Sequence, residues 1–277
     1  MQMLVIDFPN ISPVAFSLGP FDIRWYGLAY AAGLGLGWLY VRQLLATPRL
    51  WQPGQLPFPE DLASDLFIAA AIGVIVGGRL GDVLLYEPQF YFQNPAEILA
   101  VWRGGMAFHG GVIGTGLALL VLARMRNLPV WTLIDLVTAA APIGLFLGRI
   151  TNFINGELWG HVSTVPWAMV FPGADAGPLP RHPSQLYEAA TEGALLLLVL
   201  SYVIYRRQAL ARPGLVTGWF LAGYAVARMF CEHFRVDTDP HIGLGLLTSG
   251  QIYSLPMLAL GIGLIAWARG RRRDALA

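Results

Sequence analysis

The sequence predicts an all-α, polytopic integral membrane protein with seven transmembrane helices and a small cap outside the membrane. Of its 277 residues, 56% are hydrophobic and only 13% are charged, and the mean hydropathy of +0.56 is far above that of a soluble domain. Apolar runs of roughly 20 residues recur along the chain, each long enough to cross the hydrocarbon core of a bilayer. We therefore expect residues 1–277 to form a single transmembrane domain.

Hydropathy and helix breakers together place the seven spans along the chain. The predicted spans are residues 25–45, 62–86, 106–125, 132–155, 184–205, 215–234 and 248–267. The segment 157–183 contains five prolines and several turn glycines, which are incompatible with a continuous helix. We expect this insertion to form the cap.

The arginines indicate how the helices are oriented. All 18 basic residues are arginines, and eleven of them fall in loops on one side of the predicted membrane while four fall on the other. By the positive-inside rule the arginine-rich side is cytoplasmic, so the N-terminus lies outside and the C-terminus inside. The net charge of +1 also argues against nucleic-acid binding, which needs a basic surface.

Several kinds of chemistry are not expected for this chain. Its single cysteine, Cys231, excludes an internal disulfide and a multi-cysteine metal site, and its apolar surroundings predict a packing role. The sequence contains no GxSxG, HExxH, P-loop or dinucleotide-binding motif. We expect no metal and no organic cofactor. The first residues lack a basic region and a cleavage site, so no removable signal peptide is predicted.

Three arginines, Arg79, Arg149 and Arg228, lie within the predicted spans, where a charge is costly and usually functional. Arg79 precedes Asp82 by three residues and Arg228 precedes Glu232 by four, and both spacings allow an ion pair on one helix face. Structural and functional roles are both open for Arg79. For Arg149 and Arg228 we favour anion binding, because a guanidinium stays charged and grips phosphate oxygens bidentately.

The segment GRITNFINGELWG, residues 148–160, concentrates polar groups at the end of a predicted span. Arg149 and Asn152 are three residues apart and lie near one helix face, where they present several donors suited to a phosphodiester. Tyr224 precedes Arg228 by one turn and extends a polar stripe. His109, flanked by glycines, is able to transfer protons near neutral pH, although a membrane histidine also often serves only as a hydrogen-bonding residue.

These residues match a known family: the chain resembles bacterial phosphatidylglycerol:prolipoprotein diacylglyceryl transferase. The strongest match is GRITNFINGELWG at 148–160, and the other blocks occur in the family's order over most of the chain. The supporting blocks are RWYGLAY at 24–30, GGRLG at 77–81, RGGMAFHGG at 103–111, RHPSQLYE at 181–188 and GYAVARMFCEHFR at 223–235.

The resemblance implies a seven-span enzyme of the bacterial inner membrane, with a periplasmic N-terminus and cap and a cytoplasmic C-terminus. Such an enzyme moves the diacylglyceryl group of phosphatidylglycerol onto the lipobox cysteine of a preprolipoprotein signal peptide, leaving a thioether and releasing glycerol phosphate. The thiol belongs to the substrate, and the implied partners are these two substrates and the surrounding membrane lipids.

The resemblance also implies roles for individual residues. Those matched to catalysis are His109, Arg149, Glu157, Arg228 and Glu232. Those matched to substrate binding are Tyr26, Arg149, Asn152, Asn155, Gly160, Tyr224 and Arg228. The arginines would offset the charge of the departing phosphate, and Gly160 would permit close backbone approach in the cap. The thiol base is open between His109, Glu157 and Glu232.

Two other classes of function compete with the transferase. A transporter or flippase for an anionic lipid would line its path with the same arginines, but it would be expected to show inverted repeats or broken helices in matching halves, and the sequence shows none. A structural membrane scaffold would use the charges only for internal pairing. The three hypotheses differ in whether a labelled diacylglyceryl group is transferred to a lipobox peptide.

Overall fold

The computed structural model describes residues 6–9, 11–54, 58–236 and 248–274. The chain divides into two compact units. The first unit consists of residues 1–40 and 138–277, and the second of residues 41–137. Two long helices, α1 (Trp25–Leu45) and α5 (Val130–Ile154), each begin in one unit and end in the other.

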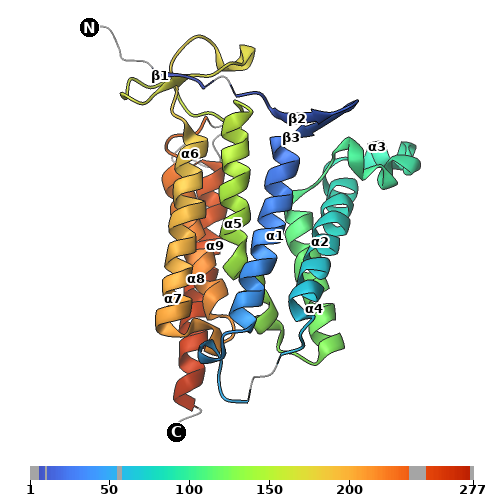
Figure 1. Ribbon diagram of the computed structural model, residues 1–277, viewed down its shortest axis with the longest axis vertical. Coiled ribbons are helices and arrows are strands. Elements are labelled where there is room, and N and C mark those ends of the chain that lie inside the picture. The colour runs from blue at the N-terminus through green and yellow to red at the C-terminus, as the bar shows by residue number, and fades with distance from the viewer. Residues whose placement is uncertain (1–5, 10, 55–57, 237–247, 275–277) are drawn as a thin grey trace. The chain divides into compact units, whose positions relative to one another are not determined.

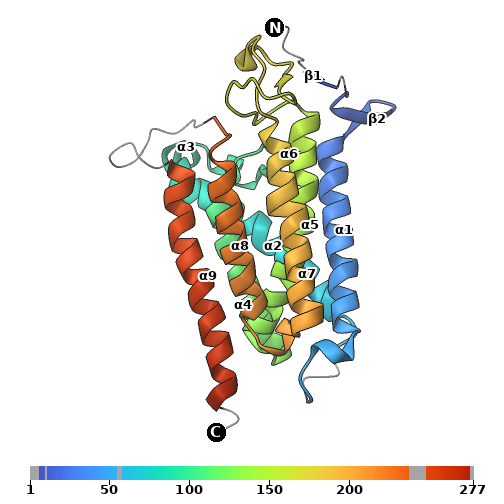
Figure 2. The same cartoon turned by 90° about the vertical axis from the view of Figure 1, so that its left-hand side faces the viewer.

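The first unit is mainly a set of long helices that run side by side, with the cap at one end (Figures 1 and 2). It contains most of α1 and α5, followed by α6 (Ser184–Glu188), a π-helical segment (Ala189–Leu195), α7 (Leu196–Arg207), α8 (Leu215–Cys231) and α9 (Ser249–Asp274). The segments α6, Ala189–Leu195 and α7 form one continuous helical stretch, and α8 packs closely against α9.

Glycines bring the helices of the first unit into backbone contact. A Cβ on Gly218 of α8 would lie 3.0 Å from the carbonyl oxygen of Gly261 in α9, and a Cβ on Gly193 would lie 2.7 Å from the Cα of Phe146 in α5. Small residues allow such approach in a bilayer, where lipid provides no hydrophobic drive between helices. Glycine at these positions therefore lets the helices of the first unit pack in close contact.

The part of the first unit that contains residues 6–24 and 157–183 combines short strands with an aromatic cluster. Strand β1 (Ile6–Asp7) pairs in parallel with β4 (Met169–Val170), and β2 (Val14–Leu18) forms an antiparallel hairpin with β3 (Phe21–Arg24). Phe8 packs on Phe153 and Phe171 with ring centroids 5.2 Å apart in both cases. This cluster fixes the end of α5 against the cap and so orients the residues that follow Phe153.

The second unit is built around two helices, α2 (Leu62–Gly81) and α4 (Phe108–Arg126). A π-helical segment, Asp82–Tyr86, extends α2, and the short α3 (Pro88–Gln93) follows it. Between α3 and α4 the chain forms two 3-10 turns, Pro95–Leu99 and Val101–Arg103, and another turn, Pro48–Leu50, follows α1.

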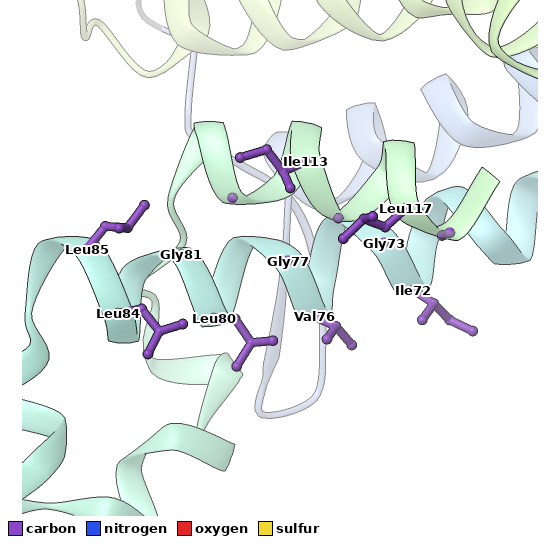
Figure 3. Close-up of a pocket in the computed structure, with 13 residues that line it drawn as sticks. Ile72, Gly73, Val76, Gly77, Leu80, Gly81, Leu84, Leu85, Ile113 and Leu117 are labelled. Carbon is purple, nitrogen blue, oxygen red and sulfur yellow. The ribbon is translucent and has the colours of Figure 1, made fainter. Parts of the chain in front are cut away.

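The α2–α4 contact leaves a shallow apolar groove of about 370 Å³ along its length (Figure 3). Its floor is glycine: a Cβ on Gly77 would lie 2.6 Å from the Cα of Gly114, and one on Gly81 would lie 2.8 Å from the Cα of Gly110. Its rim carries the aliphatic side chains of both helices, including Leu80 of α2. A surface of this kind is suited to contact with lipid chains.

Five helical stretches of the described residues are long and apolar enough to cross a membrane: 62–86, 108–126, 130–154, 184–207 and 249–270. The two remaining predicted spans are also helical. Of these, α8 is a shorter apolar helix of 17 residues. Helix α1 has 21 residues, but its glycine, tyrosine and tryptophan residues lower its hydropathy. The mostly helical architecture is confirmed and is consistent with the predicted all-α integral membrane protein; the part of the chain that the structure describes also contains four short strands.

Arg79 holds the segment before α4 in place within the second unit through hydrogen bonds to its backbone. It is only 5% exposed, and its guanidinium donates to five backbone carbonyls in the segment before α4. These acceptors are the carbonyl oxygens of Glu97, Ile98, Ala100, Gly104 and Gly105. Asp82 instead accepts from the Tyr91 hydroxyl at 2.8 Å. The Arg79–Asp82 ion pair that the spacing allows is not formed among the described residues, because backbone carbonyls already satisfy the guanidinium.

We expect Arg79→Lys to destabilise the second unit by about 3 kcal/mol, because an ammonium has three donors and cannot reproduce the planar fork that holds five carbonyls. Thermal unfolding in detergent measures the effect. The matched control is Arg103→Lys: that side chain is 64% exposed and pairs with Glu97, so its change should stay within about 0.5 kcal/mol. Equal unfolding of both variants would show that the carbonyl contacts contribute little.

Candidate active site

Arg149 and Arg228, the two arginines favoured for anion binding, converge on one carboxylate in the first unit. Glu188, at the end of α6, forms an ion pair with Arg149, whose Nε lies 3.1 Å from Glu188 Oε2. Its Oε1 accepts a hydrogen bond from Arg228 Nη1 at 3.1 Å. Arg149 comes from α5 and Arg228 from α8. One acid thus joins three helical segments and holds the two guanidinium groups close together.

A second carboxylate, Glu192, faces the same two arginines from the π-helical segment. Its Oε2 lies 3.4 Å from Arg149 Nη2, and its Oε1 lies 3.8 Å from Arg228 Nη1. Both contacts are longer than those of Glu188. Glu192 therefore lies beside the arginine pair without being its main anchor.

A third acid and a third arginine complete the network. Arg228 forms the expected ion pair with Glu232, four residues further along the chain. Arg235 donates to Glu188 Oε1 at 2.5 Å and lies 3.5 Å from Glu232 Oε1, while the Thr248 hydroxyl donates to Glu232 Oε2 at 3.2 Å. Three positive and three negative groups are thus collected in one place.

The glutamate side chains of the network are more deeply buried than its arginine side chains. The side chains of Glu188 and Glu192 are fully buried and that of Glu232 is 5% exposed, whereas those of Arg149, Arg228 and Arg235 are 18–20% exposed. The acids are covered, and the arginines keep accessible surface. An anion that approaches this network meets guanidinium groups first, which is the arrangement that binds phosphate.

Glycines determine how closely these charges approach one another. Gly193 follows Glu192 directly and packs against Phe146, one turn before Arg149 on α5, so the two helices touch where their charged residues meet. At the start of α9, Gly250 leaves room for the carboxylate of Glu232, which a Cβ there would overlap. Larger residues at either position would push the helices apart and lengthen the ion pairs.

Tyr26, Asn152 and Glu157 form a polar cluster beside this network. The buried Asn152 donates through Nδ2 to the Tyr26 hydroxyl at 3.0 Å and to Glu157 Oε1 at 2.8 Å, and Asn155 donates to the same oxygen at 3.3 Å. The turn is possible because Gly156 adopts a φ of +68°. Asn152 and Arg149 lie one turn apart on α5, but their partners differ.

Gly160 lies where two segments of the first unit meet. Its amide donates to the carbonyl of His182 at 2.9 Å, and it forms an antiparallel bridge with Arg235. A Cβ on Gly160 would overlap the carbonyl oxygen of Phe234 and would lie 2.9 Å from the Cβ of His182. The close approach expected here is confirmed, and it connects the cap to the backbone that carries Arg235.

We expect Gly160→Ala to destabilise the cap by about 2 kcal/mol and to lower activity, because the new methyl group forces Phe234 and Arg235 away. Hydrogen exchange at the His161 amide, which donates to the Phe234 carbonyl at 2.9 Å, reports the local opening. Gly177→Ala is the control: it tests backbone strain without a steric clash, because Gly177 has a φ of +69° but open space around its Cα. Only Gly160→Ala should also lower activity.

The remaining predicted residues are Tyr224 and His109. Tyr224 lies one turn before Arg228 on α8 and stacks on Phe220, with ring centroids 5.9 Å apart. His109 belongs to the second unit, in the first turn of α4, where it is exposed and its Nδ1 lies 3.4 Å from the Tyr86 hydroxyl. A role for His109 in catalysis stays a prediction.

Sequence reasoning missed three members of the network: Glu188, Glu192 and Arg235. A signal was present, because Glu188 and Glu192 are two acids four residues apart inside an apolar run, and acids at bilayer depth are as costly as arginines. Arg235 gave less indication, since it follows the predicted end of a span and was counted as a loop charge.

Comparison with known proteins identifies the family. The family model described as prolipoprotein diacylglyceryl transferase matches residues 13–267. The chain belongs to this family. A relative from Methylocella silvestris named phosphatidylglycerol–prolipoprotein diacylglyceryl transferase is 54% identical over 274 residues, which are 98% of this chain and 98% of the relative. A relative with the same name from Rhizobium meliloti is 50% identical over 279 residues, covering 100% of this chain and 97% of the relative.

Membership of the prolipoprotein diacylglyceryl transferase family makes this chain a transferase and confirms the resemblance drawn from its motifs. The motifs quoted for the resemblance include residues of both clusters described above: Arg149, Asn152 and Glu157 lie in the 148–160 block, and Glu188 ends the 181–188 block.

Proposed function

We propose that this chain transfers the diacylglyceryl group of phosphatidylglycerol to the lipobox cysteine of a preprolipoprotein, forming a thioether and releasing glycerol phosphate. The names of its full-length relatives support the reaction. The observation that carries the assignment of the site is the convergence of Arg149 and Arg228, each with accessible surface, on acids that are fully buried. No observation favours the transporter or the scaffold over this reaction.

The proposed setting is the bacterial inner membrane, crossed seven times. In this arrangement α1 and α8 join the five longer apolar helices as spans, the N-terminus and cap segment 157–183 are periplasmic, and the C-terminus is cytoplasmic. The arginine distribution supports it through the positive-inside rule. The charged network would then face the side from which lipoprotein precursors emerge.

In the proposed chemistry, Arg149 and Arg228 hold the phosphate of the lipid. The cysteine sulfur attacks the glycerol carbon, the new C–S bond forms as the bond from that carbon to the phosphate oxygen breaks, and glycerol phosphate leaves with the electron pair. Negative charge on the departing phosphate grows during this step. Fixed guanidinium groups stabilise that charge without reorganisation, which lowers the barrier.

The thiol proton must leave for the sulfur to react, because the thiolate is the nucleophile. His109, Glu157 and Glu232 are the candidate bases. His109→Gln and Glu157→Gln would separate these candidates through the pH dependence of kcat. The chain's own Cys231 is buried and takes no part in the proposed step.

The polar cluster is proposed to position the substrates. Tyr26, Asn152 and Asn155 offer hydroxyl and amide groups to the glycerol head group or to the peptide backbone, and Tyr224 lines the arginine pair. Gly160 keeps the cap close to Arg235. These residues would affect KM more than the arginines do, since they contact groups that carry no developing charge.

The test is an assay with purified protein, phosphatidylglycerol labelled in its acyl chains, and a lipobox peptide. We expect the peptide to gain the mass of one diacylglyceryl group, with one glycerol phosphate released for each. A peptide with serine in place of the cysteine should gain nothing. Movement of labelled lipid across a vesicle membrane without any peptide adduct would support the transporter and refute the transferase.

A further inference from the structure

Glu192 is the least firmly held member of the charged network. Glu188 contacts three arginines at 3.1, 3.1 and 2.5 Å, whereas Glu192 reaches only Arg149 and Arg228, at 3.4 and 3.8 Å. Its Oε1 is buried and has no hydrogen-bond partner among the described residues, as is also true of Glu188 Oε2 and Glu232 Oε1, so the longer distances to the arginines are what set Glu192 apart. A fully buried carboxylate with weak contacts is costly, so its position next to the arginine pair needs an explanation beyond stability.

The local helix geometry places Glu192 at this position. It lies within the π-helical segment Ala189–Leu195, which interrupts the stretch between α6 and α7, and such insertions often mark functional sites. Gly193 then brings the segment against α5 at Phe146. The chain thus departs from regular helix at the point where an acid is presented to both anion-binding arginines.

The difference in charge between the proposed substrate and product explains why a carboxylate lies beside the two arginines. The phosphodiester of phosphatidylglycerol carries one negative charge, whereas glycerol phosphate is a monoester with a charge of about −2 near neutral pH, as for other phosphate monoesters. Two guanidinium groups alone would therefore hold the product more strongly than the lipid. Repulsion from a nearby carboxylate also scales with the charge of the ligand, so it weakens product binding more than substrate binding.

We infer that Glu192 sets the anion affinity of the Arg149–Arg228 pair and promotes release of the phosphate product. This inference rests on the function proposed above. Glu192 acts through the two arginines, so it is a positioning and tuning residue. Glu188 does not fit this role, because its three short contacts hold the arginines together and its removal would disperse them.

The experiment compares Glu192→Gln with the unaltered chain in the peptide assay. The amide keeps the size of the side chain and one acceptor but removes the charge. We expect inhibition by added glycerol phosphate to become about tenfold tighter, and the KM for phosphatidylglycerol to fall about threefold, because a doubly charged ligand gains more than a singly charged one. A merely structural role would weaken both interactions or lower kcat alone.

The control is Asp61→Asn, which removes a carboxylate from the exposed ion pair with Arg126 in the second unit and should change neither constant. If Glu192→Gln proves too unstable to purify, Glu192→Asp draws the carboxylate back from the arginines and should shift both constants in the same direction by a smaller factor. Unchanged or weaker glycerol phosphate inhibition in the variant that folds would overturn the inference. Failure of the proposed function shows separately, as the absence of a peptide adduct with the unaltered chain.

Discussion

Replacing Arg149 or Arg228 with lysine is expected to reduce transfer to the lipobox peptide on the order of 10³-fold, within the range found when a fixed charge-stabilising donor is removed from an active site. Arg149 uses Nε for Glu188 and Nη2 for Glu192, two nitrogens that a single ammonium cannot replace. Lysine keeps the positive charge, so the network stays neutral and the chain should still fold. The loss should appear mainly in kcat, because the arginines act on charge that develops in the transition state.

Two further variants separate the contribution of Arg149 to stability from its contribution to activity. Arg149→Ala leaves the buried acids with an uncompensated negative charge, which costs about 3–5 kcal/mol. The double variant Arg149→Gln with Glu192→Gln removes one charge of each sign, so it should recover stability but not activity. Peptide lipidation measured by mass spectrometry, beside thermal unfolding in detergent, distinguishes the two. Near-normal activity in both lysine variants would refute the assignment of the phosphate site.

Replacing Glu188 with alanine is expected to cost about 3–5 kcal/mol of stability, because three arginines that are four-fifths buried lose their common partner. The arginines come from α5, α8 and the segment after α8, so their mutual repulsion would push these elements apart. Transfer activity should fall with the fold. Thermal unfolding in detergent measures the first effect and the peptide assay the second.

A matched surface variant shows whether burial is the cause. Glu97 also pairs with an arginine, Arg103, but that arginine side chain is 64% exposed. Glu97→Ala should cost less than about 1 kcal/mol, because solvent screens such a pair. Similar losses for Glu97→Ala and Glu188→Ala would show that the position of Glu188 between three arginines carries no special weight.

Much of the site follows from spacing within single helices. The four-residue spacing between Arg228 and Glu232 predicted their ion pair, and the amides after Arg149 predicted a polar cluster at the end of α5. Local spacing did not identify the partners of Arg79, although it allowed an ion pair with the nearby Asp82. Its donors instead reach carbonyls between 18 and 26 residues away, a distance that helix periodicity does not address.

The sequence by itself determined that this protein is mostly helical with apolar spans, and that it belongs to the prolipoprotein diacylglyceryl transferase family; it also predicted Arg149 and Arg228 as the anion-binding residues. Hydropathy and local motifs carry that information because each depends on neighbouring residues. Only the tertiary structure decided that Glu188, Glu192 and Arg235 complete the site. Those contacts join residues about 40 positions apart through glycine-mediated helix packing. They form only when the helices pack against one another, so patterns within a single helix do not indicate them.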